Sequence, residues 1–234
     1  MPRKNTVKSY IANGIYHVYN RGVDKRTIFL DDRDYKTFLR FLKSSLIPPK
    51  DKKDLMLAVT LQGSTFKGVP RQTKNFYGKI ELIAYCLMPN HFHFLLKQSS
   101  EKDIKEFVHS LSIRYSMYFN KRYKRTGALY QSIYKATLVM EDPYLLHISR
   151  YIHLNPQRNY SNLADAYSSY GDYLCIRKTP WVNPQPVLSF FEDTKLPFLK
   201  NITTYQSFVE KYIESSSDYL GELTLEDSDD PLQG

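Results

Sequence analysis

The chain contains 234 residues with a formal net charge of +9, and it includes 20 Tyr and 13 Phe. This length allows one domain with a hydrophobic core, or one domain plus an appendage, and we expect the second. No apolar segment predicts a membrane span or a signal peptide, so a cytoplasmic location is expected, and two separated cysteines, Cys86 and Cys175, exclude a disulfide framework or a zinc knuckle.

The positive charge is unevenly distributed along the chain. Seven acidic residues and no basic residue follow Lys211, so the preceding part is more basic than the total indicates. Nucleic-acid binding requires cations for the phosphates and aromatic rings on which unpaired bases stack. The alternative is a solvated basic surface above an aromatic core, and charge alone does not decide between the two.

The first expected elements are a strand and a helix. Residues 14–23 alternate apolar and polar positions, which predicts a strand. Residues 32–47 begin with acidic capping residues and carry apolar side chains at helical spacing, which predicts a helix that ends at Pro48. Residues 48–78 are lysine-rich and contain glycine and proline, so we expect a mobile basic insertion or a small extra element.

The elements expected over residues 79–155 complete the order of strands and helices. Residues 79–88 and 91–98 indicate two strands joined by a tight Pro-Asn turn, and residues 103–123 indicate a helix with a broad apolar stripe. Residues 128–140 indicate a further strand, and residues 141–155 a third helix with acidic residues and a proline in its first turn. The order predicts an α+β fold of the ferredoxin-like, split βαβ kind: one antiparallel sheet with helices on one face, to which the third helix is an addition.

Two pairs of residues suggest chemistry. His91 and His93 alternate along a predicted strand, with Phe92 on the opposite face. Tyr151 and Asn155 are four residues apart, so both project from one stripe of the third helix. Two imidazoles can hold a divalent metal, an amide oxygen can complete the coordination, and a nearby tyrosine can attack a phosphate. Each pair alone is a weak signal, since most such pairs are ordinary polar residues.

Four stretches of the chain resemble one known family. They are residues 16–22 (YHVYNRG), 84–93 (AYCLMPNHFH), 150–156 (RYIHLNP) and 166–170 (AYSSY). Over about residues 10–175 the chain resembles the single-tyrosine transposases of the IS200/IS605 kind, in the branch associated with repetitive extragenic palindromes.

The resemblance implies an HUH endonuclease, in which two histidines flank a bulky apolar residue. His91 and His93 would bind the metal, Asn155 would be the third ligand, and Tyr151 would be the nucleophile. Such an enzyme is a transposase that cleaves and rejoins single-stranded DNA at hairpin-flanked sites through a 5′-phosphotyrosine. The family implies Mg²⁺ or Mn²⁺, and imidazole ligands favour tighter binding of Mn²⁺.

Further residues are candidates for DNA binding. By resemblance, Asn20 and Arg21 lie near the bound strand. From their positions in the sequence, Arg150 and Arg158 bring cations to the end of the third helix. For His17, a DNA contact and a satisfied surface histidine remain equally open. Three tyrosines of the second helix could stack on bases or act as the nucleophile, but their helical spacing favours core packing. They are Tyr115, Tyr118 and Tyr123.

The resemblance divides the chain into two parts. Residues 1–175 would form the catalytic domain, and residues 176–234 a C-terminal extension that packs on the core or grips a DNA hairpin. The acidic end of the extension is expected to be disordered.

Other functions stay open on the sequence alone. A non-catalytic, domesticated protein that binds DNA or RNA hairpins would share the basic charge, and a replication-type nickase would share the chemistry. A two-histidine RNA phosphoesterase is less favoured, because a second His-x-Ser/Thr element in a suitable context is missing. The expected partner is single-stranded or hairpin DNA, without a membrane, and the protein would act as a monomer or a homodimer.

Overall fold

A four-stranded antiparallel sheet forms the centre of the computed structural model, which describes residues 10–51, 53–192 and 202–211. The strands lie in the order β4-β5-β1-β6, and every neighbouring pair is antiparallel. They are β1 (Ile15–Arg21), β4 (Ile80–Met88), β5 (His91–Gln98) and β6 (Lys135–Val139). This is the split βαβ sheet that the sequence predicts.

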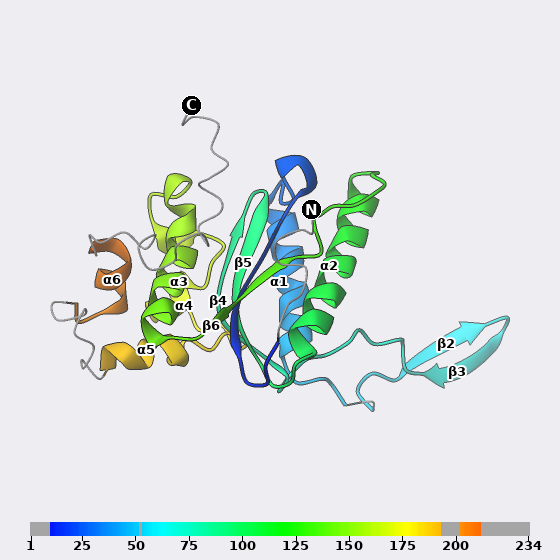
Figure 1. Cartoon of the computed structure of the whole chain (residues 1–234). Coiled ribbons are helices and arrows are strands. Elements are labelled where there is room, and N and C mark those ends of the chain that lie inside the picture. The colour runs from blue at the N-terminus through cyan, green and yellow to red at the C-terminus, as the bar shows by residue number, and fades with distance from the viewer. Residues whose placement is uncertain (1–9, 52, 193–201, 212–234) are drawn as a thin grey trace.

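Two long helices cover one face of the sheet (Figure 1). They are α1 (Asp32–Leu46) and α2 (Asp103–Arg122). The side chain of Asp31 caps α1, since its Oδ1 accepts a hydrogen bond from the backbone N–H of Asp34 at 3.2 Å. The layer between these helices and the sheet is strongly aromatic, and it buries Tyr16, Phe38, Phe92, Phe94, Phe107 and Tyr115.

The opposite face carries the remaining helices (Figure 1). They are α3 (Asp142–Leu154), the short α4 (Tyr170–Tyr173), α5 (Gln185–Glu192) and α6 (Tyr205–Lys211). They enclose a second apolar cluster, in which side chains of α5 and α6 pack with α3 and β4. The added third helix therefore covers the face that a plain ferredoxin-like fold leaves open. The described part of the extension packs on the core, whereas the acidic end, residues 212–234, lies outside the described residues.

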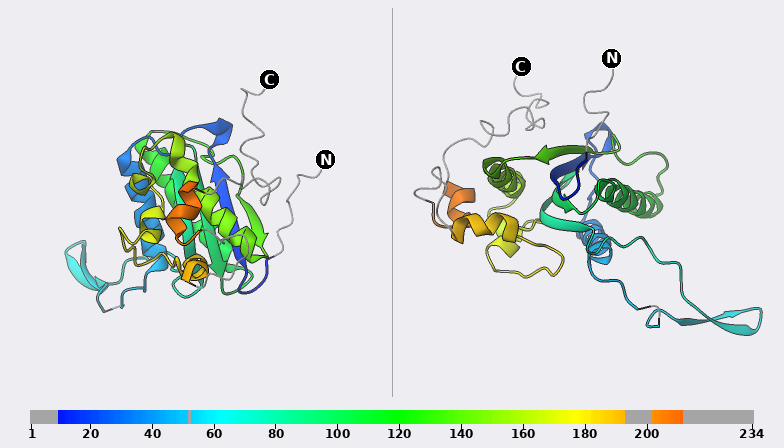
Figure 2. Two further views of the ribbon diagram at one scale, coloured as in Figure 1. Left: turned by 90° about the vertical axis from the view of Figure 1, so that its left-hand side faces the viewer. Right: turned by 60° about the horizontal axis from the view of Figure 1, so that its bottom comes forward.

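The insertion contains a small extra element. Strands β2 (Leu57–Leu61) and β3 (Ser64–Gly68) form a separate antiparallel hairpin that stands away from the body of the molecule (Figures 1 and 2). Its two turn residues, Gln62 and Gly63, both have positive φ, at 50° and 81°. That combination is typical of the type I′ turn, whose twist matches that of a two-stranded ribbon.

The last strand is shorter than predicted, whereas the third helix ends within one residue of the predicted position. The last strand covers only Lys135–Val139, because the side chain of Asn20 binds the carbonyls of Ser132 and Ile133 and holds the preceding segment in an irregular path. Helix α3 ends at Leu154, and residues Asn155–Arg158 form a 3₁₀ turn, since the proline after Asn155 lacks an N–H. Among the described helices, none is long and apolar enough to cross a membrane.

Candidate active site

Two neighbouring strands direct alternate side chains toward α3. In β5, His91 and His93 lie on this face, whereas Phe92 packs under α1 and α2. In β1, His17 and Tyr19 share the face of the two β5 histidines by the same alternation, and the register pairs Tyr19 directly with His93. Strand pairing thus gathers three imidazoles and a phenol on one face of the sheet.

Helix α3 brings Tyr151 to this cluster. The Tyr151 ring meets the His93 ring edge-on, with centroids 5.5 Å apart and planes at 89°. It also meets the His17 ring, at 6.2 Å and 80°. The rings of His91 and His93 are themselves 5.0 Å apart. The predicted nucleophile and the predicted histidine pair therefore lie together within one chain.

Asn155 follows Tyr151 by four residues, just beyond the end of α3. Its side-chain Nδ2 donates a hydrogen bond to the backbone carbonyl of Tyr151 at 3.0 Å. This bond uses the amide nitrogen and restrains the side chain. The oxygen Oδ1 is accordingly the atom through which Asn155 would bind a cation.

Buried polar contacts fix α3 on the sheet two residues beyond Tyr151. In His153, Nδ1 lies 2.7 Å from the hydroxyl of Tyr205, and Nε2 lies 2.7 Å from Oγ of Ser169. Ser169 Oγ also accepts a hydrogen bond from the backbone N–H of Tyr85 in β4 at 2.8 Å. Burial lowers the pKa of His153 to about 3, so its ring is a neutral polar bridge between helix and sheet. These contacts set the position from which Tyr151 projects.

Hydrogen bonds at Nδ1 orient both rings of the histidine pair. His91 Nδ1 lies 2.5 Å from Oδ1 of Asn90, whose Nδ2 donates to the carbonyl of Lys25 at 3.2 Å. The amide oxygen of Asn90 can only accept, so Nδ1 of His91 carries the proton and Nε2 carries a lone pair. In His93, Nδ1 lies 2.9 Å from Nε2 of His17. Each ring would thus bind a metal through Nε2, with Nδ1 held by a protein neighbour.

The available donor atoms fit a divalent cation. Two imidazole nitrogens and an amide oxygen suit Mn²⁺ and also serve Mg²⁺, which prefers oxygen and keeps several waters. Within the described part of the chain, no group of three or more His, Cys, Asp or Glu side chains is arranged to hold a metal. Asn155 supplies an amide oxygen next to Tyr151 that could serve as a third ligand beside His91 and His93.

The turn that precedes His91 is held by the segment between β1 and α1. The carbonyl of Pro89 accepts two backbone hydrogen bonds, from Ile28 at 2.8 Å and from Phe29 at 3.0 Å. Both donors lie just before α1. The start of β5 is therefore attached to the helical layer on the far side of the sheet.

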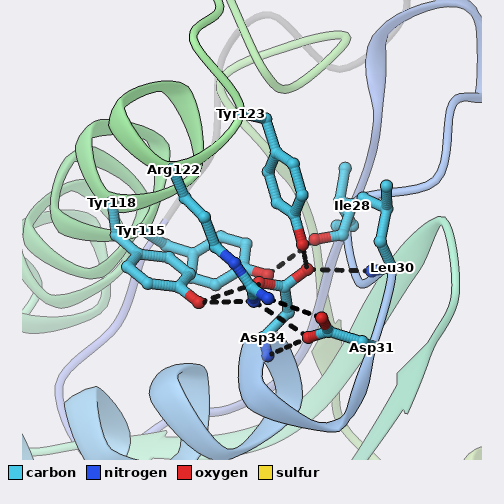
Figure 3. A network of polar contacts seen from close by, with 8 residues as sticks. All are labelled: Ile28, Leu30, Asp31, Asp34, Tyr115, Tyr118, Arg122 and Tyr123. Atoms are coloured by element: carbon cyan, nitrogen blue, oxygen red, sulfur yellow. Dashed lines mark hydrogen bonds and ion pairs between the residues drawn. The ribbon is translucent and has the colours of Figure 1, made fainter.

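A polar network in turn ties this segment to α2 (Figure 3). The hydroxyl of Tyr115 donates to the carbonyl of Ile28 at 2.6 Å. The fully buried carboxylate of Asp34 accepts hydrogen bonds from Tyr118 at 2.9 Å and from Arg122 at 2.6 Å. The tyrosines of α2 have structural roles, as their spacing predicts. Through Ile28, Tyr115 is connected to the carbonyl of Pro89 in the turn before His91.

Two of the predicted DNA-binding residues lie at the ends of elements that carry the candidate site. Arg21 ends β1 opposite His91 in the register, and its Nε donates to Oε1 of Gln131 at 3.3 Å. Arg158 is exposed in the turn that follows α3. Both guanidinium groups thus border the ends of the elements that carry the candidate site.

The other two predicted DNA-binding residues hold the protein together instead. Asn20 is buried and donates to the carbonyls of Ser132 and Ile133 at 3.0 and 2.9 Å. Arg150 is only 8% exposed, and its Nε donates to the carbonyl of Phe208 in α6 at 2.9 Å. These contacts favour structural roles, so we assign neither residue a DNA contact.

His17 and Tyr19 belong to the site, although sequence reasoning assigned neither to it. The expectation that His17 is a DNA contact or a surface histidine is corrected, because its side chain is fully buried against His93. Tyr19 stacks on His93 with centroids 5.5 Å apart, and Nζ of Lys135 lies 5.4 Å from the centroid of its ring. The available signal was the alternation of β1, which sets His17 and Tyr19 on one face.

Comparison with known proteins gives a family match over part of the chain and a shared fold. Residues 63–155 match the family model described as "Transposase IS200 like", a region that includes His91, His93, Tyr151 and Asn155. The chain is structurally similar to a REP-associated tyrosine transposase bound to a REP hairpin, with a TM-score of 0.50 and 14% sequence identity. That similarity covers 74% of this chain and 86% of the other, and at this identity it shows a shared fold.

A second similar structure is that of a candidate transposase from Deinococcus radiodurans R1. It has a TM-score of 0.35 and 17% identity, and the match covers 65% of this chain and 95% of the other. No curated protein sequence matches the chain.

Proposed function

We propose that this protein cleaves and rejoins single-stranded DNA through a covalent bond to Tyr151, since residues 63–155 match the IS200-like transposase model. One observation carries the proposal: the Tyr151 ring lies edge-on to His93 at 5.5 Å within the same chain. The nucleophile and the histidine pair then need no exchange between subunits. We therefore propose a site that assembles in cis, for which a monomer suffices.

The chemistry is a transesterification at phosphorus. The phenol oxygen of Tyr151 forms a bond to the scissile phosphorus, and the bond from phosphorus to the 3′ oxygen breaks. The phenol loses its proton, and the departing oxygen gains one and leaves as a 3′-hydroxyl. The 5′ end stays on Tyr151 as a phosphodiester, so a second 3′-hydroxyl can reverse the step and rejoin a strand without an external energy source.

The surrounding residues would bind the metal ion and the DNA. His91, His93 and Asn155 would hold a Mn²⁺ or Mg²⁺ ion, whose charge would stabilise the developing charge on the phosphate. Arg21 and Arg158 would bind flanking phosphates, whereas the buried Tyr19 ring stays packed against His17 and His93. The similar REP-associated tyrosine transposase is bound to a REP hairpin, which makes a hairpin-flanked single strand the first DNA to test.

A covalent-capture experiment tests the proposal. A pool of hairpin oligonucleotides with randomised single-stranded flanks, labelled at the 3′ end, is incubated with the protein and Mn²⁺ and then denatured with detergent. The label should migrate with the protein, because the downstream fragment keeps the 3′ end. Tyr151→Phe should lose the adduct completely, since it removes only the attacking oxygen, while its DNA binding and thermal unfolding stay close to those of the wild type.

Tyr160→Phe is the matched control. Tyr160 is a partly buried tyrosine in the same region that lies outside the histidine cluster, so its variant should keep the adduct. An adduct that persists in Tyr151→Phe would contradict the assigned nucleophile. Salt-sensitive hairpin binding without an adduct under any divalent metal would instead favour a non-catalytic hairpin-binding protein.

A further inference from the structure

His17 is a fully buried histidine at the centre of the candidate site. It lies on β1, and its Nε2 is 2.9 Å from Nδ1 of His93. The two rings are nearly parallel, with planes at 12° and centroids 5.1 Å apart. Tyr19 stacks against His17 at 4.9 Å, and Tyr151 meets it edge-on. The imidazole of His17 is therefore restrained on several sides and directed at one atom of His93.

The hydrogen bond between the two imidazoles has a defined direction when His93 binds a cation. A metal takes the lone pair of Nε2, so the proton of a neutral His93 ring must sit on Nδ1. Nδ1 then donates to Nε2 of His17, which accepts. Metal-binding histidines usually direct the other ring N–H to a carboxylate, a carbonyl or water, and that partner fixes tautomer and orientation. Here an imidazole on the neighbouring strand occupies that place.

We infer that His17 is a positioning residue, which holds the His93 ring in the orientation and tautomer that present Nε2 to a divalent cation. This inference rests on the proposed function, because it concerns the same metal site. His91 has a separate partner, Asn90, at its own Nδ1. The two rings of the pair are thus oriented from opposite sides, one by the turn before β5 and one by β1.

Three substitutions at position 17 separate positioning from simple packing. His17→Gln places an amide close to where Nε2 stood and can still accept from His93. His17→Asn is also polar, but its shorter side chain places the amide near the former Nδ1 and does not reach His93. His17→Phe keeps a stacked ring without any acceptor. If His17 only filled space, the Mn²⁺ affinities of the three variants would rank in the same order as their thermal stabilities.

The main readout is Mn²⁺ binding to the DNA-free protein, measured by calorimetry at neutral pH. His17→Gln should keep most of the wild-type affinity, whereas His17→Asn and His17→Phe should lose about 10- to 100-fold, the usual cost of removing a partner of a metal ligand. Nitrogen NMR of the metal-free protein gives an independent readout. His93 should hold its proton on Nδ1 in the wild type and in His17→Gln, and should lose this preference in His17→Asn.

His147→Gln provides the matched control for burial. His147 is another fully buried histidine of the same chain, and its ring contacts Phe208 in α6. Its variant should lower the melting temperature without changing Mn²⁺ affinity. Equal Mn²⁺ affinity in the wild type and all three position-17 variants would overturn the positioning role while leaving the proposed function intact. A wild type that binds no Mn²⁺ would remove the metal site itself, and the inference with it.

Discussion

The two faces of the central sheet use neighbouring residues of the same strands for different purposes. In β5, Phe92 packs under α1 and α2. On the other face, His93 meets the ring of Tyr151 from α3, and His91 lies beside His93. In β1, Val18 belongs to the aromatic layer and His17 to the imidazole cluster. Because side chains alternate along a strand, a tightly packed face fixes the backbone from which the reactive face projects.

The largest contrast between the faces should appear at adjacent positions of β5. His91→Ala removes one of the two imidazole ligands and should lower Mn²⁺ affinity and adduct yield by more than about 100-fold, since even loss of a supporting partner costs 10- to 100-fold. The free energy of unfolding should change little, because His91 is only partly buried. Calorimetry and the covalent-capture assay measure the first effect, and urea unfolding the second. An undiminished adduct in His91→Ala would show that the histidine pair is not part of the chemistry.

The neighbouring Phe92→Ala should give the opposite result. Phe92 is fully buried between Phe38 and Phe94, so truncation should lower the free energy of unfolding by about 3–5 kcal/mol. At a temperature where the variant remains folded, it should keep most of its Mn²⁺ affinity. If Phe92→Ala abolished metal binding in the folded state, the two faces would not be separable functions of one strand.

Alternation also explains which parts of the site the sequence could predict. His91 and His93 alternate within one strand, and Tyr151 and Asn155 share one helix turn, so local periodicity was enough to group each pair. That His17 supports His93 depends on the register between β1 and β5, whose residues are distant in sequence. Local patterns carry no information about that register.

The two DNA-binding residues that proved to be buried illustrate the same limit. Asn20 is covered by the segment around Ile133, and Arg150 by α6. Both covering segments come from distant parts of the chain. Sequence alone therefore cannot tell whether a polar residue next to a motif contacts DNA or binds a backbone carbonyl from a distant part of the chain. The predicted order of strands and helices did not suffer from this limit, because each element has its own periodicity and caps.

A smaller effect should follow from the polar network that stiffens the α1 and α2 face. Asp34→Ala removes the buried acceptor shared by Tyr118, Arg122 and Tyr123, and should lower the free energy of unfolding by about 1–3 kcal/mol. Chemical denaturation measures this loss. The control is Asp32→Ala, which breaks only an exposed ion pair with a lysine one turn away and should cost no more than about 1 kcal/mol. Equal losses in the two variants would contradict the anchoring role of the network.

The smallest effect should come from the cations that border the reactive face. Arg21→Gln and Arg158→Gln should each weaken binding of a hairpin oligonucleotide several-fold and reduce the dependence of log affinity on log salt by about 0.7–0.9, the contribution of one phosphate contact. Covalent capture at saturating DNA should persist, because neither side chain joins the bonds that form and break. Arg33→Gln offers a matched exposed arginine, on α1 behind the opposite face of the sheet. If Arg33→Gln changed the salt dependence as much as Arg21→Gln, the DNA would also contact the face covered by α1 and α2. DNA binding would then not be confined to the face that carries the candidate site.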